Sequence, residues 1–211
     1  MMTFILSLPS IIFRRTRMPL AALLLLPGFQ MRTMAATADA SEPVNKYRTW
    51  HEAALHGDVD EIDVSIENFE EQLQLSPDDP LAKAYLGSVC ALRAKESFWG
   101  MTKLEYLERA DQLMSKAIAE APDNPRIRMI RAISLYKLPE RFDKRPVALA
   151  DFQQLVPIAR AGESDLTLRE RQAILYYASL SYADANLPGA GQLKADCHSL
   201  SPDSEYGKLT Q

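Results

Sequence analysis

Cysteine, histidine and glycine are scarce in this chain of 211 residues, with 2, 3 and 8 copies respectively. Two cysteines cannot build a disulfide framework. The composition, with 47% hydrophobic and 25% charged residues, excludes a disordered or collagen-like polymer and indicates one ordinary globular domain. The sequence has no glycine-rich phosphate loop and no nucleophile-elbow or metalloprotease motif. We therefore predict that the chain is not an enzyme and needs no cofactor.

The three histidines do not have the spacing of a metal site. His51 and His56 are five residues apart, which does not align them on one helix face, and His198 directly follows Cys197. Zinc ligands come as close pairs, with a second pair further along the chain. We expect no metal site, and we expect the histidines to be surface residues.

Positive charge is also in short supply once residues 1–38 are set aside. Those residues hold four arginines and no acid, so the rest of the chain has 20 basic and 28 acidic side chains and a net charge of −8. A surface this acidic gains nothing from neutralising phosphates. Nucleic acid is therefore excluded as a partner of the whole surface.

The chain has no apolar run of the roughly 20 residues that a membrane-spanning helix needs. Three arginines precede a mostly apolar stretch, 18–29, which two prolines and a glycine interrupt. With the small residues that follow, this order predicts a secretory signal peptide over 1–38, cleaved after Ala38 or, as a second choice, Ala40. We expect export, most simply to a bacterial periplasm. The alternative is an uncleaved anchor formed by residues 1–29.

Beyond Ala40 the apolar residues recur at helical spacing, as in Ile62, Ile66 and Phe69. No run alternates with a period of two, so no strand is expected. The helix starts are marked by reciprocal capping pairs and by cap residues that precede proline: Asp58 with Glu61, Thr167 with Glu170, Asp79 with Pro80, and Asn124 with Pro125. These signals predict about eight helices joined by short loops.

A loop containing proline and aspartate recurs at residues 75–80, 121–125 and 200–203. Because this recurrence points to an internal repeat, the chain is compared with repeat families. It resembles the tetratricopeptide repeat (TPR) family, whose unit has 34 residues. The resemblance covers units 46–79, 80–124, 125–162 and 171–204, with extra residues in 94–103 and 138–146, a linker at 39–45 and a C-terminal tail at 205–211.

Small residues stand where the TPR pattern brings the two helices of a unit together. They are Ala53, Gly87, Ala132 and Ala178 at the eighth position, and Ser65, Ala110, Ala148 and Ala190 at the twentieth. A large apolar residue follows in the first three units, as Phe69, Met114 and Phe152, but the fourth unit has Lys194 there. The aromatic residue expected at the eleventh position is absent. The sequence thus resembles a divergent TPR protein, and the alternative is a generic helical bundle.

This resemblance implies an all-α, TPR-like α-solenoid of about four helix pairs that binds a protein or peptide in a concave groove. By the family pattern, the groove is lined by the following residues of the four first helices: Tyr47, Trp50 and Ala54; Leu81, Ala84, Ser88 and Ala91; Arg126, Met129, Ile133 and Tyr136; Gln172, Leu175, Ser179 and Tyr182. The Lys/Asn set with which chaperone-binding members grip a terminal carboxylate is missing. For each aromatic residue, packing in the core is the alternative.

Charge is unevenly distributed along the repeats. Residues 58–79 hold nine acids and no base, whereas residues 126–145 hold seven bases against Glu140 and Asp143. We expect the basic unit to dock an acidic segment of a partner, or the acidic first unit of a second copy. The bases expected to do so are Arg126, Arg128, Arg131, Arg141, Lys144 and Arg145. The alternative is that these charges are solvated helix faces that only aid solubility.

Taken together, the sequence predicts an exported adaptor or assembly factor of the cell envelope. The alternatives are a self-assembling structural module and an enzyme with an unrecognised site in the groove. Cys90 and Cys197 fall five helices apart in such an array, too far for a disulfide, so we expect both to be free and buried.

Overall fold

A computed structural model describes residues 35–98 and 100–211, with side chains from Pro43 onward. Regular structure in this part of the chain consists of nine α-helices and one 3-10 helix, with no strand. The all-α prediction is therefore confirmed. Residues 1–34, where most of the expected signal peptide falls, lie outside the described residues. No described helix combines the length and apolar character needed to cross a bilayer.

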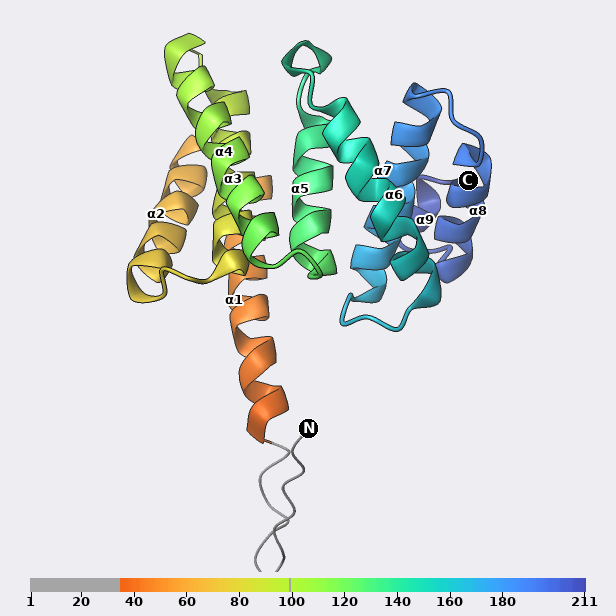
Figure 1. The fold of residues 1–211 in the computed structure, drawn as a ribbon, viewed down its shortest axis with the longest axis horizontal. Helices are drawn as coiled ribbons and strands as arrows, with labels where there is room; N and C mark the ends of the chain where they lie inside the picture. Colours follow the sequence, from red (N-terminus) through yellow and green to blue (C-terminus); the bar gives the residue numbers. More distant parts are fainter. Residues whose placement is uncertain (1–34, 99) are drawn as a thin grey trace, which may run out of the picture. The chain divides into compact units, whose positions relative to one another are not determined.

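Short connections join the helices, which Figure 1 labels in chain order. They are α1 (Ala35–His56), α2 (Val59–Leu75), α3 (Pro80–Glu96), α4 (Gly100–Glu120), α5 (Pro125–Lys137), η1 (Glu140–Phe142), α6 (Arg145–Ala161), α7 (Leu168–Asp184), α8 (Ala190–Leu200) and α9 (Glu205–Lys208). The chain divides into two compact units, Met1–Ala38 and Asp39–Gln211. The second unit contains α2 to α9 and most of α1.

The predicted caps start the helices as expected. Asp58 before α2 and Thr167 before α7 each form a complete capping box with the glutamate three residues on. Asp79 and Asn124 accept hydrogen bonds from the first free backbone N–H groups of α3 and α5, each of which begins with proline. These interactions satisfy donors that no helical carbonyl can reach, so the helix starts are fixed locally.

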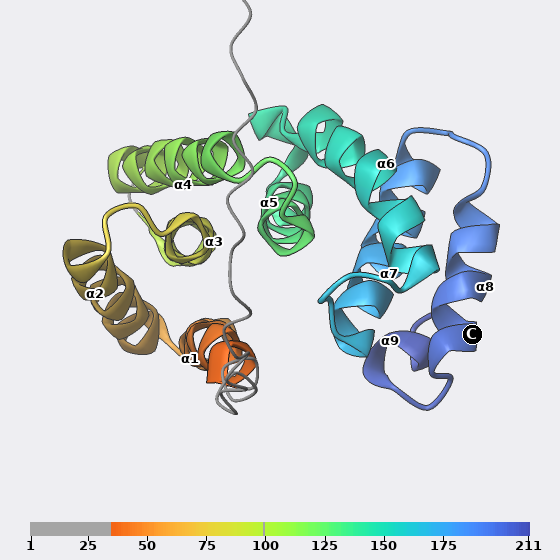
Figure 2. The same cartoon turned by 60° about the horizontal axis from the view of Figure 1, so that its bottom comes forward.

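The helices of Asp39–Gln211 lie in two layers, which Figure 2 shows with α3 and α5 seen nearly end-on. In the inner layer α3 packs against α5 and α5 against α7. The aromatic ring of Tyr47 on α1 lies 6.2 Å from that of Tyr85, which joins α1 to α3 in this layer. The outer layer consists of α2, α4, α6 and α8, each packed against inner helices that are its neighbours in sequence.

Small residues allow the close approach between the layers that the sequence predicts. A Cβ atom on Gly87 would lie 2.7 Å from Met114 Cγ and 3.0 Å from the carbonyl oxygen of Ala110. Any side chain at this position would therefore force α3 and α4 apart. Ala132 and Ala178, at the equivalent positions of α5 and α7, are fully buried.

In two places the expected pattern is off by one residue. On α1, Ala53 is exposed and Ala54 is buried in its stead. On α8, Lys194 is exposed and the preceding Leu193 fills the core. Since successive helix residues are about 100° apart around the axis, a single step carries a side chain from the core to the surface.

The segments expected to be a linker and a tail are partly helical. Residues 39–45 belong to α1 rather than to an extended linker. The C-terminal segment contains α9, which packs against α7 and α8. Gly207 is buried there, and a Cβ atom on it would overlap the carbonyl oxygen of Ser201 and would lie 2.6 Å from that of Pro202, so no side chain would fit.

Cys90 and Cys197 are both free and buried, as predicted. Burial raises the pKa of the Cys90 thiol to about 12, so that thiol stays protonated at neutral pH. The Cys197 thiol donates a weak hydrogen bond to the carbonyl oxygen of Gln172 at 3.4 Å, which joins α8 to α7. Both cysteines therefore act as small core residues.

Candidate functional site

The inner helices surround an open groove of about 1000 Å³. Residues of α1, α3, α5 and α7 line it, and η1, the beginning of α4 and Tyr206 of α9 complete its walls. Its apolar lining includes Leu55, Leu92, Leu107, Met129, Ile130, Ile133 and Leu138. The spacing of Ile130, Ile133 and Lys137 places these residues along one face of α5, so this helix presents a continuous stripe to the groove.

A chain of polar side chains crosses this apolar lining. His51 Nε2 on α1 lies 2.8 Å from Ser88 Oγ on α3, and Ser134 on α5 donates its hydroxyl hydrogen to Ser88 Oγ at 2.9 Å. Burial, followed by the positive charge of Lys137, lowers the pKa of His51 to about 4. His51 is therefore neutral at physiological pH and can accept a hydrogen bond at Nε2.

The position of His51 corrects the expectation that the histidines are surface residues. Its ring packs against that of Tyr85, with a centroid distance of 5.2 Å, and the rest of the imidazole faces the groove. The hydrogen bond to Ser88 holds the imidazole ring of His51 in this orientation.

More cationic than anionic side chains line the groove. Six are cationic (Arg48, Lys95, Lys103, Lys137, Arg141 and Arg169), and two are carboxylates (Glu52 and Glu170). Both carboxylates form ion pairs with lining arginines: Arg48 with Glu170 at 3.4 Å, and Arg169 with Glu52 at 3.2 Å. The groove is thus positive, although residues 39–211 carry a net negative charge.

Arg126, expected to line the groove, is instead a buried ion-pair partner with 4% of its surface exposed. Its guanidinium binds both carboxylate oxygens of Glu170, at 2.8 and 3.2 Å, and the carboxylate and carbonyl of Asp165, each at 2.7 Å. Burial alone would lower the pKa of Arg126, but the hydrogen bonds and charges of Glu170 and Asp165 outweigh it and raise the pKa. Arg126 therefore joins α5 to α7 beneath the groove.

Arg128 and Arg131 are likewise paired inside the chain. Both bind the buried carboxylate of Asp151 on α6, Arg128 at 3.0 Å and Arg131 through two bonds of 2.8 Å. Lys144 pairs with Asp111 at 2.9 Å, and Arg145 pairs with Asp184. Of the six bases expected to dock a partner, all but Arg141 are therefore engaged in ion pairs within the chain, and Arg128 and Arg131 share the single carboxylate of Asp151.

Part of the acidic first unit is likewise engaged within the chain. Asp58, Glu61 and Asp79 cap helices. Asp63 pairs with Arg93, and Glu70 pairs with Arg109. Four of the nine acids are therefore left for solvent or a partner: Asp60, Glu67, Glu71 and Asp78.

The aromatic residues expected to line the groove pack in the core or against it instead. Tyr47 is buried and donates its hydroxyl hydrogen to Asp79 at 2.6 Å, and Trp50 packs edge-on against Phe69. Tyr136 donates its hydroxyl hydrogen to Asp184 at 2.8 Å, and Tyr182 is partly buried against the core. Of the ten residues expected to bind a partner, only Ser88, Met129 and Arg141 line the groove.

The residues that do line the groove are displaced by one position from many of the expected ones. Arg48 and His51 replace Tyr47 and Trp50 on α1, and Lys137 replaces Tyr136 on α5. Tyr206 could not be found from the repeat pattern, because it lies in the segment expected to be a tail. The only sequence signal for it was Ser204, a residue type that often caps the start of a helix and that caps α9 here.

No group of three or more histidine, cysteine, aspartate or glutamate side chains gathers as metal ligands within the described ranges. The groove therefore offers a ligand three kinds of contact: apolar surface, the hydrogen-bonded His51–Ser88–Ser134 chain, and cationic side chains of which only some are paired with carboxylates. Comparison of the sequence and fold with family models, curated proteins and solved structures finds no match.

Proposed function

We propose that this protein is an exported, TPR-like scaffold that holds a segment of a partner protein in the groove. The alternation of inner and outer helices supports a solenoid, because inner helices of successive pairs pack side by side and outer helices pack on their sequence neighbours. Such a stack leaves one face of the inner helices uncovered. A partner segment would supply the missing cover.

The observation that carries this proposal is the groove itself. Its volume of about 1000 Å³ is at the upper end of the range of pockets for small molecules, and it is open to solvent. Leu55 is 41% exposed within it, an apolar surface that a partner's side chains would cover. The hydroxyl of Ser134 retains acceptor capacity, which suits the N–H groups of a peptide.

The hydrogen bond between His51 and Ser88 is the observation that favours an enzyme. A neutral histidine beside a serine hydroxyl is part of the arrangement used by serine nucleophiles. Among the described residues, however, no carboxylate hydrogen-bonds to the His51 ring, and such a partner is what orients the base. A binding role for this polar chain therefore has the better support.

Selection of random peptides on the full chain tests the proposal. Peptides that bind should lose at least about tenfold in affinity to Leu55→Glu, which places a charge in the apolar lining. The matched control is Val64→Glu, because Val64 is 56% exposed on α2 and lies outside the groove. Failure to enrich any peptide, or equal loss in both variants, contradicts binding in the groove.

A further inference from the structure

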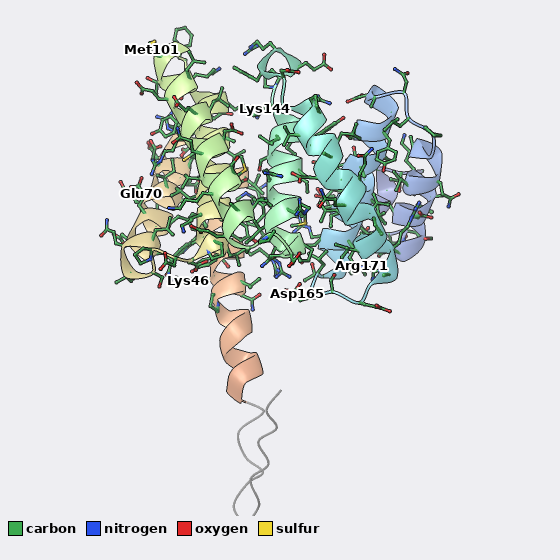
Figure 3. All side chains as sticks on the ribbon, in the orientation of Figure 1. Lys46, Glu70, Met101, Lys144, Asp165 and Arg171 are labelled. Carbon is green, nitrogen blue, oxygen red and sulfur yellow. The ribbon has the colours of Figure 1, made fainter. Side chains whose placement is uncertain are left out.

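The two ends of the groove differ in how their charges are paired. Figure 3 shows Met101 and Lys144 at one end of the helices and Lys46 and Asp165 at the other. Lys95, Lys103, Lys137 and Arg141 come from the end of α3, the start of α4, the end of α5 and η1, and together they form what we call the cationic end.

The opposite end is electrically balanced. Arg48 contacts Glu170, which Arg126 also binds, and Arg169 contacts Glu52 and Glu205. Each of these arginines therefore already has a carboxylate, and an incoming anion would have to displace it. This end offers a partner little electrostatic attraction.

At the cationic end the charges lack such partners. Within the described ranges Lys103, Lys137 and Arg141 form no ion pair, and the one ion pair of Lys95 is with the exposed Glu96, at 3.6 Å. Lys137 and Arg141 lie over the rings of Tyr177 and Phe142, at 5.1 and 4.9 Å from the ring centroids, and these contacts leave their positive charge in place. Partial burial, followed by the charge of Lys95, lowers the pKa of Lys137. Like charges held together in a partly enclosed space repel, and an anionic group that enters relieves this repulsion.

The apolar surface beside the cationic end is part of the groove itself. Leu55, which is 41% exposed, Leu92 and Ile133 line the groove together with the four cations. A small anion bound at the cations would leave these side chains in water, whereas a polypeptide with an apolar face would cover them. This favours a protein segment over a free metabolite as the occupant.

We propose that the groove binds an acidic amphipathic segment of a partner protein, with its acidic residues at Lys95, Lys103, Lys137 and Arg141. The segment's apolar side chains lie along Leu55, Ile130 and Ile133, between the cationic and the balanced end. This inference rests on the proposed protein-binding function and adds the charge of the partner and the direction in which it binds.

Three peptides of equal length test the charge of the partner. Each has the same apolar face, and one end carries three glutamates, three glutamines or three lysines. We expect fluorescence anisotropy to show affinity in the order glutamate, glutamine, lysine, with about tenfold or more between the first and last at low salt, and a smaller difference at high salt. Equal affinity of all three peptides overturns the inference.

Variants of the protein locate the effect. Lys103→Glu, Lys137→Glu and Arg141→Glu combined should abolish the preference for the glutamate peptide. The control combines Lys116→Glu, Lys194→Glu and Lys208→Glu, which make the same change in net charge at exposed sites outside the groove. The milder glutamine triple at the first three positions keeps the test valid should the reversal unfold the chain. A preference that survives in the glutamine triple overturns the assignment.

Direction is tested by zero-length carbodiimide coupling, which joins a carboxylate to a lysine amine with loss of water. We expect the glutamates of the bound peptide to couple to Lys95, Lys103 or Lys137, as identified by mass spectrometry. If the peptide binds and its glutamates couple to none of these three lysines, the assigned direction is wrong. Oleate serves as a further probe: if it binds and depends on Lys137 while no peptide binds, both the inference and the proposed function fail. If peptides bind in a Leu55→Glu-sensitive way without charge preference, only the inference fails.

Discussion

Removal of the Asp151 carboxylate should destabilise the chain far more than removal of a surface carboxylate. Asp151 is 1% exposed and accepts three hydrogen bonds from the guanidinium groups of Arg128 and Arg131. Asp151→Ala leaves both positive charges at the interface of α5 and α6 without a counter-charge. Loss of one member of a buried ion pair typically costs about 3–5 kcal/mol.

The magnitude should lie at the lower end of that range. The Arg128 and Arg131 side chains keep 13% and 16% of their surface exposed, so part of each guanidinium can be rehydrated. We expect a loss of about 3 kcal/mol, which corresponds to a fall in Tm of roughly 6–12 °C for a chain of this size. The comparison variant is Asp196→Ala, whose partner Arg160 is 46% exposed, and it should lose less than about 1 kcal/mol.

Urea denaturation, monitored by circular dichroism, gives the free energy of unfolding of both variants. Replacement of all three groups by apolar residues, Asp151→Leu with Arg128→Leu and Arg131→Met, should recover much of the loss because no charge is then left unpaired. If Asp151→Ala loses no more than Asp196→Ala, the pair contributes little and the reasoning fails. The same geometry implies that charge reversal at Arg128 and Arg131 would report on folding rather than on a partner.

Three further predictions concern other parts of the chain. The pKa of His51 is about 4 in the folded chain and 6.5 in the unfolded chain, so the unfolded chain takes up the proton first as the pH falls. The free energy of unfolding should therefore be highest above pH 6.5 and should decrease by up to about 3 kcal/mol as the pH falls towards 4. His51→Gln should remove that part of the pH dependence of urea unfolding, and an unchanged dependence contradicts the assignment. Gly207→Ala should cost about 1–3 kcal/mol and loosen α9 so that trypsin cleaves after Lys208, because the new Cβ would overlap the Ser201 carbonyl. Ser88 should not react with a fluorophosphonate probe, and labelling that His51→Gln abolishes would favour the enzyme instead.

Local signals were read correctly from the sequence. Asp58, Asp79, Asn124 and Thr167 start their helices as predicted, because a cap depends only on residues two or three positions away. The small residue at Gly87 was also predictable, since the repeat spacing shows where two helices cross.

The candidate site was predicted less well, for a geometric reason. The repeat pattern placed the groove on the inner helices, and Ser88 and Met129 do line it. A register error of one residue turns a helix by about 100°, so Tyr47 fell in the core and Tyr136 packed against it, while His51 and Lys137 faced the groove. Apolar spacing is too coarse to resolve a rotation of this size on helices that are buried on several sides.

The sequence by itself determined that this chain is helical, where the four capped helices α2, α3, α5 and α7 begin, and that the helix crossing at Gly87 needs a small residue. These properties depend on neighbours within one or two turns. Only the tertiary structure decided which charges remain available, because Asp151 lies 20 residues from Arg131 and Glu170 lies 44 from Arg126. The charge of a groove depends on such distant partners, and a count of charges along the chain cannot supply it.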